Sequence, residues 1–71
     1  MHPEFKKYYD LEVKHRKEIQ ENPNDSVAYY NLASALAKQG KFDESIKQYN
    51  KSIEINPKFW QAYYSLGDVH S

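Results

Sequence analysis

The chain has 71 residues, with 10 basic and 10 acidic side chains and no cysteine. A formal net charge of zero argues against partners that are recognised by bulk charge, such as nucleic acid, an anionic membrane or an acidic substrate. The absence of cysteine from the sequence excludes disulfides, thiolate metal sites and a cysteine nucleophile.

The first predicted element is a helix from Glu4 to about Glu21. This stretch contains neither glycine nor proline, and Pro3 suits a first helical turn, where its missing N–H costs nothing. Mostly apolar residues recur every three or four positions and predict a helix with one buried side. They are Phe5, Tyr8, Leu11, His15 and Ile19.

The second predicted helix is Val27 to Lys38, which is rich in alanine and leucine. The segment 22–26 before it stops the first helix at a proline and offers Asn24 or Asp25 as a cap for the next helix. Gly40 follows the last apolar residues and is expected to end this second helix.

A third helix is expected from Asp43 or just before to Ile55, and a fourth from Phe59 to Val69, with Asn56-Pro57 between them. The apolar stripe of the third helix is Phe42, Ile46, Tyr49 and Ile53, and the residues expected to face solvent are Lys47, Gln48, Asn50 and Lys51. The sequence has no alternating runs typical of strands. We therefore predict an all-α fold of about four helices in antiparallel hairpins joined by short turns.

The chain repeats itself at a stride of 34 residues. Asn22-Pro23 recurs as Asn56-Pro57, and Ala28-Tyr29-Tyr30 recurs as Ala62-Tyr63-Tyr64. Residues 19–37 and 53–71 share seven identities without a gap. A fixed period of this length indicates stacked helical hairpins.

This pattern resembles the tetratricopeptide repeat, a 34-residue helical hairpin, which implies a TPR-type α-solenoid. The residues that carry the resemblance are Tyr29, Leu32, Ala33 and Leu36 in the first helix, Gly40 and Phe42 at the turn, Ser45, Tyr49 and Ser52 in the second helix, and Pro57 at the close. Residues 22–59 are expected to form one full repeat. Residues 60–71 match the first helix of a second, incomplete repeat, and residues 1–21 match a second helix only weakly.

One and a half repeats are fewer than the roughly three that such stacks usually need, because each hairpin has a side that only a neighbour can cover. We expect the N-terminal helix to act as a cap on the repeat. The fourth helix is expected to present Tyr63, Leu66 and Val69 with a single neighbour to cover them. Together with Trp60, these residues favour self-association, by end-to-end stacking or by exchange of a terminal helix.

The resemblance implies a non-enzymatic scaffold that binds a protein or peptide in a groove lined by first helices. The groove positions carried over are Val27, Tyr30, Asn31, Ser34 and Lys38, then Gln61, Tyr64, Ser65 and Asp68. Tyr30 and Tyr64 suit binding hot spots, although both could instead pack on neighbouring helices. Relatives that clamp a terminal carboxylate need Lys, Asn and Arg along this groove. Only Asn31 matches, so we do not expect chaperone-tail binding of that type.

Other chemistry has little support in the sequence. The basic cluster at residues 14–17 is interrupted by acidic residues on the same helix, which argues against a nucleic-acid face. His2, His15 and His70 are too far apart for a metal site, and His15 is expected to pack or to pair. Asp43 and Glu44 are expected to stabilise a helix N-terminus. No glycine loop or nucleophile elbow is present, so we expect neither an enzyme nor a cofactor.

Two further expectations complete the sequence-based interpretation. Residues 1–7 lack the apolar stretch of a signal peptide, and no apolar run approaches the roughly 18 residues of a transmembrane helix, so we expect a cytoplasmic protein without membrane contact. The alternative to a binding scaffold is a purely structural fragment, or an engineered self-assembly module, without a natural ligand.

Overall fold

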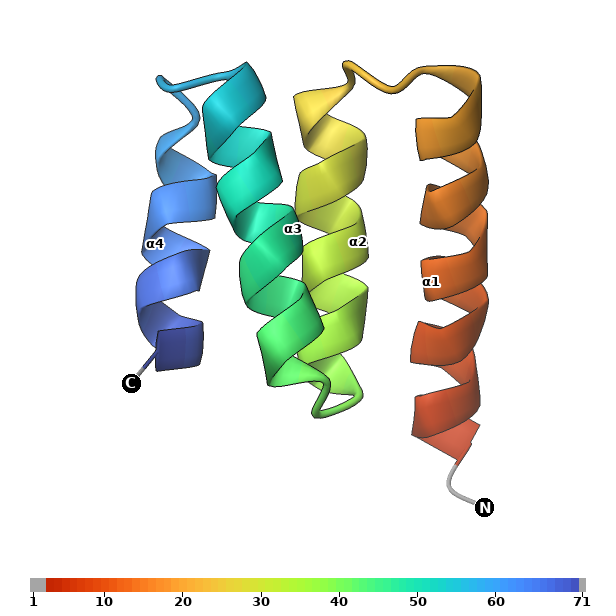
Figure 1. Ribbon diagram of the computed structural model, residues 1–71. Helices are drawn as coiled ribbons and strands as arrows, with labels where there is room; N and C mark the ends of the chain where they lie inside the picture. The colour runs from red at the N-terminus through yellow and green to blue at the C-terminus, as the bar shows by residue number, and fades with distance from the viewer. Residues whose placement is uncertain (1–2, 71) are drawn as a thin grey trace.

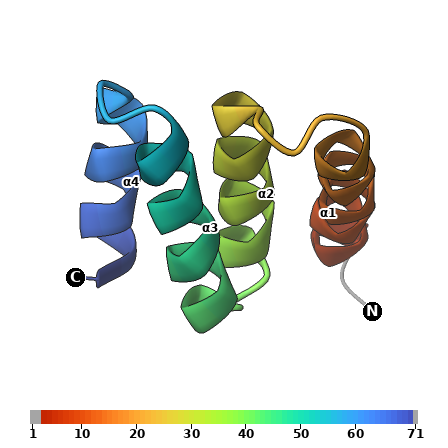
Figure 2. The same ribbon diagram turned by 45° about the horizontal axis from the view of Figure 1, so that its top comes forward.

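The protein is all-helical, as the sequence predicts. The computed structural model describes the backbone of residues 3–70 and the side chains of residues 6–65 and 67. Within this part of the chain lie four helices, α1 (Pro3–Glu21), α2 (Ser26–Lys38), α3 (Phe42–Ile55) and α4 (Trp60–His70). They lie side by side in chain order and alternate in direction (Figure 1), and the tilted view shows the same order (Figure 2).

The turns follow from their capping residues. Asp25 caps α2, because its Oδ1 accepts from the backbone N–H groups of Val27 at 3.0 Å and Ala28 at 3.2 Å. At the end of α2, Gly40 has a φ of 80°, a conformation that glycine adopts without the steric cost of a side chain. The Lys41 N–H then reaches the Leu36 carbonyl at 3.0 Å, which completes a Schellman cap and turns the chain into α3.

The core is centred on α2, which lies between α1 and α3. Leu32 and Leu36 are fully buried, with exposed fractions of 1% and 0%, and each such leucine contributes roughly 1.5–3 kcal/mol by burial. On the α4 side, the core cluster joins Ala33, Tyr49 and Ala62. The core therefore links all three helices of the C-terminal part through small residues on α2 and α4 and one large ring on α3.

Two buried serines allow α3 to approach α2 closely. Ser45 and Ser52 are both 0% exposed. The Ser45 hydroxyl donates to the Ala33 carbonyl at 2.7 Å, and the Ser52 hydroxyl donates to the Ser26 carbonyl at 2.8 Å. The two serines are thus small enough for the close approach and make two hydrogen bonds that an alanine could not make.

Three details of the sequence-based helices are wrong. Phe42, expected on the apolar stripe of α3, is 53% exposed, because it is the first residue of the helix and lies at the end of α3 beyond the buried crossing. Gln48 and Lys51, expected in solvent, are half-buried. Gln48 faces the space between α1 and α3, and Lys51 lies 3.8 Å from Glu54.

The crossing at Ser45 yields a stability prediction. Ser45→Leu inserts three extra carbon atoms where no space exists and is expected to lower the free energy of unfolding by about 3 kcal/mol. Ser45→Ala keeps the close approach and loses one hydrogen bond, a cost of about 0.5–1.5 kcal/mol. Urea unfolding followed by circular dichroism measures both variants. Equal stability of the two variants would contradict a close helix crossing at this residue.

Candidate protein-binding surfaces

The predicted groove residues of α2 form one continuous stripe. Val27, Asn31, Ser34 and Lys38 follow at spacings of four, three and four residues, which places them on one side of a helix. Val27 and Lys38 are exposed, whereas Asn31 and Ser34 are half-buried. Within the described part of the chain, the side chains of these four residues make no hydrogen bond or ion pair, so the amide, the hydroxyl and the ammonium group are free to meet a ligand.

The predicted groove positions on α4, one period later, include Gln61, which is exposed, and Ser65, which is half-buried. Both side chains are likewise uncommitted in the described structure. The side chain of Asp68, the last predicted groove residue, lies outside the described residues. We call the residues Val27, Asn31, Ser34, Lys38, Gln61 and Ser65 the A stripe.

The two tyrosines predicted as groove hot spots have different environments. Tyr30 is half-buried, and its ring lies 5.1 Å from that of Phe59 and 5.8 Å from that of Tyr49, centroid to centroid. Tyr64, one period later, is 72% exposed. Tyr30 therefore packs on neighbouring elements, the alternative that the sequence left open, whereas Tyr64 is available for contact. Only one member of the pair has the character expected of a hot spot.

The outer side of α4 is aromatic and uncovered. Trp60, Tyr63 and Tyr64 have exposed fractions of 67%, 51% and 72%. Gly67 continues this side, and apart from its chain neighbours and the backbone of its own helix no atom lies within 4 Å of the place where a Cβ would stand. We call these four residues the α4 end face. Leu66 and Val69, the other residues predicted for self-association, have side chains outside the described part of the structure.

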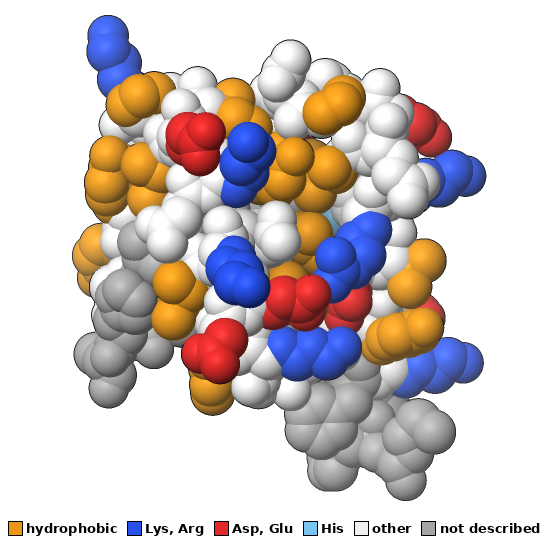
Figure 3. All heavy atoms as spheres, viewed as in Figure 1, with side chains coloured by type: hydrophobic (Ala, Val, Ile, Leu, Met, Phe, Trp, Pro, Cys, Tyr) orange, Lys and Arg blue, Asp and Glu red, His pale blue; other side chains and the backbone are white. Residues whose placement is uncertain are grey.

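On another face, acidic and basic side chains gather between α1 and α3 (Figure 3). Their centre is Glu12, which is 7% exposed. Its carboxylate accepts from Gln39 at 2.9 Å, from Arg16 at 3.0 Å and from Lys41 at 3.2 Å, and Arg16 also bonds Glu44 of α3 at 3.0 Å. This network joins α1 to the turn after α2 and to α3.

The sequence pattern did not indicate that Glu12 is buried, because a glutamate next to Leu11 interrupts the apolar stripe rather than extending it. The one available signal was Arg16, four residues later, since such pairs meet on a helix. The basic cluster at residues 14–17 thus contains two side chains that bind within the protein, Arg16 and His15, while Lys14 and Lys17 are exposed.

Burial by itself raises the pKa of Glu12, but the hydrogen bonds from Gln39, Arg16 and Lys41 outweigh it and hold the pKa below the ordinary value of 4.5. Glu12 is therefore ionised at neutral pH. A carboxylate with a lowered folded-state pKa adds stability above its unfolded pKa, and this stability is lost as the pH falls through the folded pKa.

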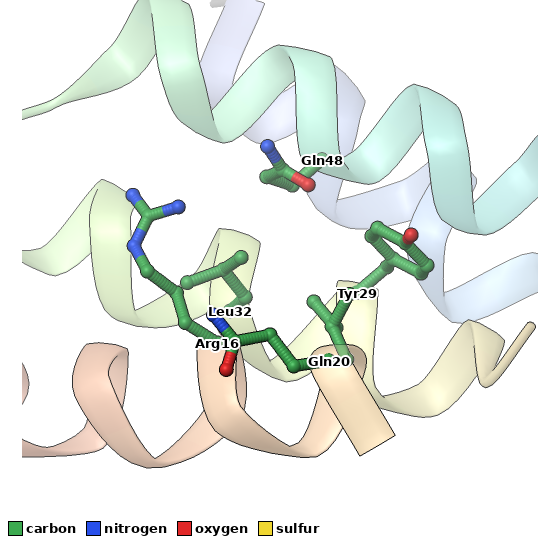
Figure 4. Close-up of a pocket in the computed structure, with 6 residues that line it drawn as sticks. Arg16, Gln20, Tyr29, Leu32 and Gln48 are labelled. Carbon is green, nitrogen blue, oxygen red and sulfur yellow. The ribbon is translucent and has the colours of Figure 1, made fainter. Parts of the chain in front are cut away.

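A shallow pocket of about 280 Å³ lies next to this network and shares Arg16 with it. It is lined by Arg16, Ile19, Gln20, Tyr29, Leu32 and Gln48, with Arg16 and Tyr29 at opposite ends (Figure 4). The volume is at the low end for small-molecule sites, and the positive charge of Arg16 is already met by two carboxylates.

His15 pairs with Glu18, and pairing was one of the two roles expected for it from the sequence. Its Nδ1 lies 2.6 Å from a carboxylate oxygen of Glu18, which follows three residues later in the same helix. Within the described residues no three His, Asp or Glu side chains form a metal-binding group, and no helix there is long and apolar enough to cross a membrane.

The Glu12 network can be tested by mutation and pH. Glu12→Gln removes the charge that Arg16 and Lys41 share and is expected to lower the free energy of unfolding at pH 7 by about 1–3 kcal/mol. Because the wild-type advantage depends on ionised Glu12, it should shrink as the pH falls below 4.5 and be smaller at about pH 3 than at pH 7.

Urea unfolding at both pH values measures this effect. Glu21→Gln, an exposed carboxylate on the same helix, is the matched control and should change stability by less than about 0.5 kcal/mol. A Glu12→Gln deficit that is the same at both pH values would show that the charge of Glu12 is not what matters.

The comparisons with known proteins agree with the four-helix fold described above. Residues 26–59 match the model of the tetratricopeptide repeat. Hsp70-Hsp90 organizing protein 3 of Arabidopsis thaliana is 40% identical over 62 residues, 86% of this chain and 11% of that protein. A small glutamine-rich tetratricopeptide repeat-containing protein of Mycosarcoma maydis is 39% identical over 51 residues, 72% of this chain and 14% of that protein.

A peroxisomal targeting signal receptor of Kluyveromyces lactis is 33% identical over 51 residues, 72% of this chain and 9% of the receptor. The chain spans about a tenth of the length of these curated relatives. The matched family model begins at Ser26, the first residue of α2, and ends at Phe59, one residue before α4. The chain therefore belongs to the tetratricopeptide repeat family, with one complete repeat formed by α2 and α3.

Proposed function

We propose that this chain is a non-enzymatic module that binds another protein or a peptide along the A stripe. The observation that carries the proposal is the set of uncommitted polar groups on α2, above all the half-buried Asn31 and Ser34. A half-buried amide without a partner in the protein is well placed to pair with a backbone amide of a ligand. The names of the relatives, which include a targeting signal receptor, support a binding role.

The charge of the A stripe favours a largely uncharged ligand. Its described members are one apolar residue, four uncharged polar residues and a single base, Lys38. One base is too few to anchor a terminal carboxylate in the way that the multi-base groove of some relatives does. The ligand that fits is an extended segment held by backbone hydrogen bonds, with at most one acidic side chain near Lys38. A cytoplasmic location stays a prediction.

A second candidate function is self-association, and the α4 end face is the observation that favours it. Three aromatic side chains that are each more than half exposed form a surface of the kind that protein interfaces bury. End-to-end stacking of copies or exchange of a terminal helix would both cover it. A module that only assembles with itself would need no other ligand. This corresponds to the alternative stated from the sequence, a structural or self-assembling module without a natural ligand.

The names of the relatives suggest peptides for testing the A stripe. Tiled peptides from Hsp70 and Hsp90, and peptides that carry a peroxisomal targeting signal, are titrated into the labelled protein while amide chemical shifts are recorded. We expect at least one peptide to shift the signals of Asn31, Ser34 and Ser65. Asn31→Ala should weaken its binding about fivefold to tenfold, the loss of one hydrogen bond.

The matched control is Lys47→Ala, an exposed residue of α3 outside the A stripe, which should leave the affinity unchanged. If no peptide of the panel binds, or if Asn31→Ala and Lys47→Ala weaken binding equally, binding along the A stripe is contradicted.

A further inference from the structure

The α4 end face has the makings of a helix-crossing surface. In the 34-residue register, Gly67 corresponds to Ala33 of α2. Ala33 is the residue at which α3 crosses α2, with the Ser45 hydroxyl 2.7 Å from its carbonyl. Gly67 is smaller still, and the space over it is open. A helix can therefore approach α4 at Gly67 at least as closely as α3 approaches α2 at Ala33.

The side chains around Gly67 are suited to covering such a helix. Tyr64 corresponds to Tyr30, whose ring packs against Tyr49 of α3 and Phe59. Tyr64 lacks any such ring contact in the described structure and is 72% exposed, and Trp60 beside it is 67% exposed. Of the rings around the crossing between α2 and α3, Tyr30 thus has an exposed counterpart on α4, Tyr64, and Trp60 adds a second exposed ring beside it.

The helix that covers this face is unlike α1. In the same register, Ser45 and Ser52, which α3 turns toward α2, correspond to Leu11 and Glu18 of α1. Glu18 is bonded to His15 at 2.6 Å, and Lys7 and Lys14, on the same side of α1, are exposed. Burying these charges against an aromatic surface would cost more than it gains. Head-to-tail stacking, with α1 of one copy on α4 of the next, is therefore disfavoured.

We propose that the α4 end faces of two copies pair with each other about a two-fold axis. This inference rests on the self-association put forward above and specifies its mode. The four described residues of the face carry no charge, so these residues do not repel their equivalents in a second copy. The gap over each Gly67 can receive an aromatic ring from the partner. Such an isologous contact closes at the dimer, whereas head-to-tail stacking would continue into longer assemblies.

The expected affinity is low. From the exposed fractions of the three aromatic side chains and their size, the pairing buries roughly 800 Å² in total, below the roughly 1,200 Å² of standard stable interfaces. We therefore expect a dissociation constant on the order of 100 µM and rapid exchange between monomer and dimer.

Trp60 makes the pairing directly observable, because it is the only tryptophan of the sequence. Sedimentation is measured between about 10 µM and 1 mM, a range that brackets the expected dissociation constant, and tryptophan emission is recorded on the same samples. We expect the mass to rise to that of a dimer and stop there, with Trp60 emission shifting to shorter wavelength as the ring is buried.

Tyr64→Glu places a charge on each copy within the face and should abolish both changes, and Gly67→Leu, which fills the gap, should weaken pairing at least tenfold. The matched control is Tyr9→Glu, the same substitution at a tyrosine of α1 that is 54% exposed, which should still dimerise. Circular dichroism checks that each variant keeps its helix content.

These outcomes test the tail-to-tail pairing of two α4 end faces separately from self-association in general. A mass that grows beyond the dimer, a dimer without a shift in Trp60 emission, or a dimer that survives Tyr64→Glu overturns tail-to-tail pairing while self-association stands. A strictly monomeric protein at 1 mM overturns both, and it leaves peptide binding along the A stripe to its own test.

Discussion

The close approach of α2 and α3 is the constraint on which the rest of the structure depends. Ala33, Ser45 and Ser52 are fully buried at this crossing, and the two serine hydroxyls donate to main-chain carbonyls of α2. Because the backbones come this close, the side chains on either side of the contact are directed outward to the neighbouring helices. Tyr49 consequently packs in one cluster with Ala62 of α4. On the other side of α2, Leu32 lies next to Ile19 and Arg16 of α1.

Each further helix adds to this pair by covering one side, and the two outer helices do so with different chemistry. α1 is held at its middle by Glu12, whose partners lie on α1 itself and on the turn after α2, so a polar network replaces part of the apolar contact. α4 is held by Ala62 and by the ring of Phe59 near its start, and its other side remains aromatic and open. α1 is thus held partly by charged and polar side chains, whereas α4 is held by apolar ones.

Much of the fold could be predicted from the sequence, because the signals are local or periodic. The 34-residue period, the glycine turn and the proline stops gave the four helices nearly to the residue, and Asp25 was one of two capping candidates. Ser45 and Ser52 were among the residues that carry the family resemblance, and the structure places both at the crossing with one hydrogen bond each.

The remaining features depend on contacts between distant residues, which no local pattern contains. Glu12 is buried because Gln39 and Lys41 come to it across 27 and 29 residues of sequence. Tyr30 and Tyr64 are equivalent in the repeat, but the ring of Tyr30 packs against Phe59, whereas Tyr64 has no such ring contact among the described residues. Periodicity treats the two as the same, and the neighbours decide which one is available for binding.

If stability is the sum of contacts between neighbouring helices, it must be uneven along the chain, and native-state amide hydrogen exchange of the dilute protein tests this most directly. α2 has a neighbour on each side, so its central amides should exchange only by global unfolding, whereas those of α4 should open locally and exchange at least roughly tenfold faster. Equal protection of α2 and α4 would contradict the account, since it would mean that the helices unfold as a single unit regardless of how many neighbours each one has.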